Sequence, residues 1–109
     1  MILQKWKLKI KIYKISTNND GYLDLNKSLI KAKKLGFYRI FLESGIKLTT
    51  NFLRADLIDD LKIFMSNTKL GKNGSGNIKK YFRFFLKNKR KVAEKVNLFC
   101  DKLISYKIK

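Results

Sequence analysis

The chain lacks histidine and proline altogether, and it contains a single cysteine, Cys100. Without histidine, Ser-His-Asp and Cys-His catalysis and most zinc sites are excluded. A single cysteine cannot form an internal disulfide, which fits a reducing, cytoplasmic compartment. No apolar run approaches the ~20 residues that a membrane span requires, so we expect no membrane partner.

Acidic residues are also scarce. Eight Asp and Glu stand against 26 Lys and Arg, which gives a formal net charge of +18. Such a charge is typical of proteins that bind nucleic acid. However, arginine, which is the residue expected for bidentate contacts to phosphate or guanine, occurs only four times. We therefore interpret the charge as a solvated lysine surface and keep a small basic nucleic-acid-binding protein as the alternative function.

Length and composition predict one folded domain with a modest core, because 45% of the 109 residues are apolar. Apolar residues alternate with lysine over 5–15, which predicts a strand with one buried and one lysine-covered face. A turn over 16–22 follows. The spacing then predicts a helix with Asp24 or Asn26 as N-cap and Gly36 as its stop.

The middle of the chain predicts a strand, a helix and a second strand. The apolar run 37–42 predicts a buried strand, 46–54 a short amphipathic helix and 61–65 the next strand. This order is a βαβ unit, whose two strands are parallel neighbours. The segments 90–99 and 102–108 predict an antiparallel hairpin. The expected fold class is thus α/β, with a mostly parallel sheet and a C-terminal antiparallel hairpin.

Two intervening segments are less specific. Residues 66–78 contain Gly71, Gly74 and Gly76 and predict a surface loop, without the Gly-Lys-Ser/Thr of a phosphate-binding P-loop. The aromatic segment 81–86 is consistent with a core strand or a short helix, and stacking on nucleic-acid bases is a minor alternative.

The turn Glu43-Ser44-Gly45 lies between the predicted strand and the predicted helix. Anions bind at such turns, because backbone N–H groups and the helix dipole point there. Glu43 closes the strand at the end where open α/β sheets bind ligands, although a solvated turn carboxylate is an equal interpretation. With little acid–base or metal chemistry available, a reaction carried by a bound cofactor, such as hydride transfer, is compatible.

An ordered set of motifs covers most of the chain: Ile40-Phe41-Leu42, Glu43-Ser44-Gly45, Thr49-Thr50-Asn51, Phe52-Leu53, Leu57-Ile58-Asp59-Asp60-Leu61 and Lys69-Leu70-Gly71, flanked by Asp20-Gly21 with Asp24-Leu25 and by Asn97-Leu98-Phe99-Cys100-Asp101. The set resembles the C-terminal reductase domain of the bacterial bifunctional deaminase-reductase of riboflavin biosynthesis. That family has a dihydrofolate-reductase-like fold, of which this chain would be the C-terminal portion.

The resemblance implies NADPH-dependent reduction of 5-amino-6-(5-phosphoribosylamino)uracil to the ribityl form, and it implies a homodimer. Carried over to this sequence, Glu43 contacts the substrate. The NADPH phosphates contact Gly45, Ile46, Lys47, Leu48, Thr49, Thr50 and Asn51. The sequence departs from the family at Ser44, where the family has a second glycine. The family's domain also has a preceding half, so an inactive fragment and a non-catalytic assembly piece are further alternatives.

Overall fold

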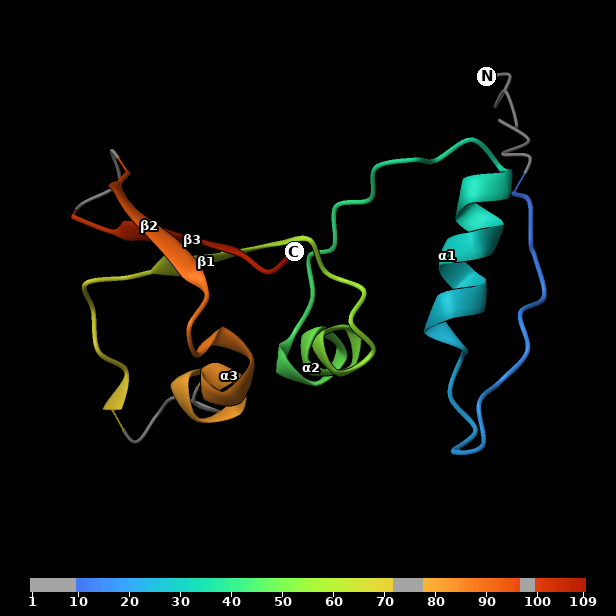
Figure 1. Cartoon of the computed structure of the whole chain (residues 1–109), viewed down its shortest axis with the longest axis horizontal. Coiled ribbons are helices and arrows are strands. Elements are labelled where there is room, and N and C mark those ends of the chain that lie inside the picture. Colours follow the sequence, from blue (N-terminus) through green and yellow to red (C-terminus); the bar gives the residue numbers. More distant parts are fainter. Residues whose placement is uncertain (1–9, 72–77, 97–99) are drawn as a thin grey trace, which may run out of the picture. The chain divides into compact units, whose positions relative to one another are not determined.

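The computed structural model describes residues 10–71, 78–96 and 100–109 (Figure 1). The chain divides between Arg39 and Ile40 into a first and a second unit, and each unit is described by itself. The helices are α1 (Leu25–Lys34), α2 (Ile46–Arg54) and α3 (Ile78–Leu86), and the strands are β1 (Asp60–Met65), β2 (Arg90–Lys95) and β3 (Lys102–Lys107). The bounds of α2 are those that the amphipathic spacing predicted.

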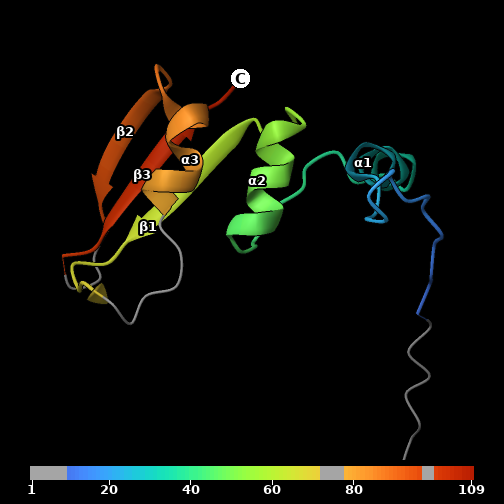
Figure 2. The same cartoon turned by 90° about the horizontal axis from the view of Figure 1, so that it is seen from below.

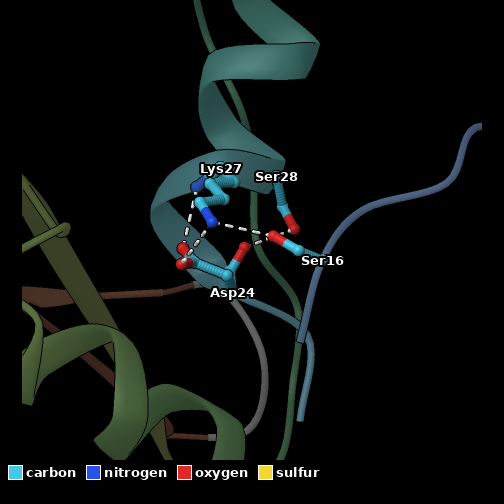
Figure 3. Close-up of polar contacts among 4 residues, drawn as sticks. All are labelled: Ser16, Asp24, Lys27 and Ser28. Atoms are coloured by element: carbon cyan, nitrogen blue, oxygen red, sulfur yellow. Dashed lines mark hydrogen bonds and ion pairs between the residues drawn. The ribbon is translucent and has the colours of Figure 1, made fainter. Parts of the chain in front are cut away.

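Helix α1 is capped at both ends by residues that flank it directly in the sequence. At its start, the side chain of Asp24 accepts a hydrogen bond of 2.9 Å from the backbone N–H of Lys27, which confirms Asp24 as the N-cap (Figure 3). At its end, Gly36 adopts a φ of 95° and its N–H bonds the carbonyl of Lys33. A left-handed residue after the C-cap favours glycine, which explains the stop.

We expect Asp24→Ala to destabilise α1 by about 1 kcal/mol, because the cap acceptor is lost. Asp24→Asn keeps an acceptor oxygen and removes only the 3.9 Å ion pair with Lys27, which is largely exposed. Exposed ion pairs contribute little to stability. The asparagine variant should therefore have nearly the same urea unfolding midpoint as the wild type, measured by circular dichroism. An asparagine variant as unstable as the alanine variant would show that the charge matters and the cap does not.

The predicted N-terminal strand is wrong over the described residues. Residues 10–16 form no strand, and only an isolated bridge between Thr17 and Leu23 closes the turn around Gly21. Residues 5–9 lie outside the described residues. Segment 10–16 instead runs beside α1 (Figure 1), where the Lys31 ammonium lies 4.5 Å from the centre of the Tyr13 ring. Alternation defines two faces, but a strand also needs a hydrogen-bonded partner.

The second unit contains a three-stranded sheet in the order β1-β3-β2, with antiparallel pairing at both junctions. The predicted mostly parallel sheet is therefore wrong, whereas the antiparallel hairpin of β2 and β3 is confirmed. Central strand β3 pairs Lys107 with Asp60 on one side and with Arg90 on the other. The Lys107 ammonium and the Asp60 carboxylate form an ion pair of 3.0 Å across this register.

The parallel prediction failed at residues 37–42. This segment forms no strand, and Phe41 is 85% exposed where a buried strand was expected. Strand β1 pairs with β3 instead, so the described residues contain no βαβ unit. An apolar run forms a buried strand only when a neighbouring strand supplies hydrogen-bond partners. The local sequence pattern does not show whether such a neighbour exists.

The core of the second unit lies between α2 and α3, which contact each other. Thr50 and Leu53 of α2 and Phe82 of α3 are buried, with exposed fractions of 4–6%. Figures 1 and 2 show α3 against one face of the sheet. Four half-buried sheet residues share one face in the register: Leu61, Ile63, Ile104 and Tyr106. The aromatic segment 81–86 is thus helical, with Phe82 as its core residue.

The connections agree with the sequence where they are described. Residues 66–71 form the start of the predicted loop, while 72–77, including Gly74 and Gly76, lie outside the described residues. Cys100, two residues before β3, has a φ of 67°. The preceding residues 97–99 lie outside the described residues.

Candidate functional site

The start of α2 presents backbone N–H groups without a capping side chain. Gly45 is the N-cap in an extended conformation (φ −73°, ψ 176°), and as a glycine it makes no side-chain capping hydrogen bond. The intrahelical bonds begin at Thr49, whose N–H donates to the Gly45 carbonyl at 3.1 Å. The first N–H groups of a helix have no intrahelical acceptor, and the helix dipole is positive there. This end of α2 can therefore hold an anion.

Two hydroxyl groups lie beside this helix start. The Oγ of Ser44 and the Oγ1 of Thr49 are 2.9 Å apart and share a hydrogen bond. Ser44 is exposed and Thr49 is half-buried. One hydroxyl of such a pair accepts from the other and keeps its own proton for an anion. The sequence predicted no role for the Ser44 hydroxyl, which differs from the glycine of the family at this position.

The remaining candidates of the helix are not equivalent. The Thr50 hydroxyl donates to the Ile46 carbonyl at 2.7 Å and the residue is 6% exposed, so this hydroxyl faces away from solvent. Asn51 is half-buried and also lies more than one turn beyond the N-cap. Lys47 and Leu48 are exposed in the first turn. The structure thus brings residues 45–49 together at one helix end and places Thr50 and Asn51 deeper.

Glu43 is exposed, and it lies two residues before the N-cap. Its side chain is therefore accessible to a ligand near the helix start. Within the described residues, no group of three or more His, Cys, Asp or Glu could hold a metal ion. The chemistry that this region offers is anion binding by N–H and hydroxyl groups, with a single carboxylate alongside.

Two surface depressions lie in the first unit, and residues 43–51 line neither of them. One has a volume of about 400 Å³ and is lined by Lys11, Tyr13, Leu35 and Phe37. The other has a volume of about 260 Å³ and is lined by Lys14, Ile15, Ser16, Lys27, Ile30, Lys31 and Lys34. This second group of residues was not predicted from the sequence, although lysines at 27, 31 and 34 follow one face of a helix.

Comparison of the chain with protein-family models, with curated proteins and with solved structures gives no match. Across 10–71, 78–96 and 100–109, none of the helices has both the length and the apolar character needed to cross a membrane.

Proposed function

We propose that this chain is part of an NADPH-dependent reductase of riboflavin biosynthesis, which reduces 5-amino-6-(5-phosphoribosylamino)uracil to the ribityl compound. The proposal follows the ordered motifs of the sequence. The observation that carries it is the start of α2, where the N-cap Gly45 provides no capping side chain immediately after Glu43-Ser44. The motifs assign a phosphate of NADPH to this position, and the helix end has the charge and the donors for one.

Each residue has a distinct role in this proposal. NADPH supplies the hydride, and the chain binds and orients the reactants. The N–H groups of the first turn of α2 donate to a phosphate oxygen, and the Ser44–Thr49 hydroxyl pair adds one O–H donor beside them. Glu43, which is exposed, accepts hydrogen bonds from the hydroxyls or amines of the aminouracil substrate.

Thr49 and Thr50 provide a matched test, because they are adjacent but differ in the use of their hydroxyls. We expect Thr49→Val to weaken NADPH binding about tenfold or more, because a hydrogen bond to a charged group contributes about 1.5–3 kcal/mol. Thr50→Val should leave the affinity within about twofold, because that hydroxyl already donates to a backbone carbonyl. Calorimetric titration of the full chain with NADPH measures both.

Two outcomes of that titration contradict the proposal. Equal losses for both valine variants would show that the helix start does not contact the cofactor. Absence of saturable NADPH binding, both for the chain alone and for the chain mixed with the preceding half of a family reductase domain, would remove the reductase function.

The proposal includes a homodimer in the cytoplasm. The second unit leaves large apolar side chains exposed, among them Phe41 (85%), Phe64 (68%) and Phe84 (85%), and a second subunit is one way to cover such surface. Cys100 is an exposed free thiol, which is consistent with a reducing compartment.

A further inference from the structure

One face of α1 gathers positive charge around a depression. Lys27, Lys31 and Lys34 lie on this face at helical spacing, with Ile30 between them, and all four line the 260 Å³ depression. The opposite wall is segment 14–16, which adds the Lys14 ammonium and the Ser16 hydroxyl. Four of the seven lining residues are thus lysines from two separate segments of the first unit.

The positive charge of this depression is only partly compensated. Asp24 lies 3.9 Å from the Lys27 ammonium and also caps α1. Among the described residues, Lys14, Lys31 and Lys34 have no carboxylate within ion-pair distance. Lysines four residues apart on a helix repel each other. An anion in the depression relieves this repulsion, so the site favours a negatively charged ligand.

Two of the lysines are already held in place. The Lys27 ammonium donates a hydrogen bond of 2.9 Å to the Ser16 hydroxyl oxygen, as Figure 3 shows. The Lys31 ammonium lies over the Tyr13 ring, and this cation–π contact restrains its side chain. Side chains that are positioned before binding lose less conformational freedom when the ligand arrives.

The dimensions favour a small ligand. A volume of about 260 Å³ is slightly below the range of about 300–1,000 Å³ for small-molecule sites, so only a small group fits. Lysine binds phosphate as a point charge, without the planar geometry that arginine uses for bidentate recognition. The Ser16 hydroxyl keeps its own proton, because its oxygen accepts from Lys27, and it can donate that proton to a phosphate oxygen.

We propose that this depression binds the phosphate or pyrophosphate group of a small phosphorylated molecule. The site uses Lys14, Lys31 and Lys34 as the charges and Ser16 as an additional donor. It belongs to the first unit and is independent of the helix start at Gly45. The inference therefore does not rest on the reductase function.

The test uses inorganic phosphate and pyrophosphate as probes in calorimetric titrations of the full chain at about 0.15 M ionic strength. We expect Lys31→Gln/Lys34→Gln to weaken pyrophosphate binding about tenfold or more, because two charge-assisted contacts are lost. The matched control is Lys33→Gln/Lys62→Gln, which removes the same charge from exposed positions outside the depression. This control should bind within about twofold of the wild type. Lys14→Gln repeats the test without altering the helix.

Each outcome decides the proposal. Loss of binding in the Lys31/Lys34 and Lys14 variants, with the control unaffected, supports a phosphate site. Equal losses in the control would show that pyrophosphate responds only to net charge, and this overturns it. Tight binding of a single-stranded RNA with a steep salt dependence, without saturable pyrophosphate binding, also overturns it and favours a polymer partner. A nucleotide that binds more tightly than free pyrophosphate identifies the source of the phosphate.

Discussion

Replacing Phe82 with alanine will destabilise the second unit by about 3–5 kcal/mol, the range for removal of a buried phenylalanine. Phe82 is 4% exposed, and Leu53 is the other buried apolar residue among those described. A unit of this size has a total stability of only about 5 kcal/mol. The variant should therefore be largely unfolded at 25 °C, and urea unfolding followed by far-ultraviolet circular dichroism measures the loss.

Phe84 supplies the control for this experiment, because it lies on the same helix and is 85% exposed. Phe84→Ala should change the free energy of unfolding by no more than about 1 kcal/mol, because it loses only the edge-to-face contact with Phe85, at 5.5 Å between ring centres. Both variants remove the same side chain from α3, so helix propensity does not distinguish them. Similar losses in the two variants would mean that α3 does not pack against α2 through Phe82.

Replacing Gly45 with aspartate will separate the stability of α2 from its capacity to bind an anion. Aspartate is among the preferred N-cap residues, so α2 should be as stable as in the wild type or slightly more stable. The same carboxylate accepts hydrogen bonds from the first-turn N–H groups, and its negative charge repels a phosphate. We expect NADPH affinity to fall about tenfold or more while thermal unfolding shows no loss of stability. Calorimetry and circular dichroism on one preparation measure both quantities.

Gly45→Ala is the matched control for this substitution. The backbone at Gly45 has a φ of −73°, and a Cβ atom there meets no other atom within 4 Å. Alanine is therefore sterically tolerated, and its side chain neither caps the helix nor carries a charge. It should bind NADPH within about twofold of the wild type, with a small loss of helix stability. An aspartate variant that binds NADPH as well as the alanine variant would exclude the helix start as a phosphate site.

Local signals predicted the parts of the fold that local interactions determine. Asp24 and Gly36 determine the ends of α1 through contacts within a few residues, and both were readable from the sequence. The bounds of α2, the strand character of β1 and the β2–β3 hairpin were predicted for the same reason. In each case the deciding interactions lie along the segment itself or across a short connection.

Strand pairing was not predictable in this way. Residues 10–16 and 37–42 have the composition of strands, but neither pairs with a strand among the described residues. The apolar pattern of β1 is equally compatible with a parallel and an antiparallel neighbour, and its register with β3 depends on residues far away in sequence. Periodicity reports which face is apolar, whereas pairing depends on what else folds nearby.

The candidate sites show the same division. The position of the helix start at Gly45 followed from a local motif, but the sequence did not show that the Thr50 hydroxyl is occupied by the Ile46 carbonyl. The lysines around the depression could not be grouped either, because Lys14 reaches the others only through the approach of its segment to α1.

The antiparallel pairing of β1 with β3 also determines when each unit can fold during synthesis. Asp60 and Lys107 form their ion pair across 47 positions of sequence, whereas the contacts that close α1 lie between Ser16 and Phe37. Contacts between distant residues form slowly, because a long loop must close first. The local contacts of the first unit can therefore form early during synthesis, while β1 remains unpaired and open to aggregation until β3 has emerged.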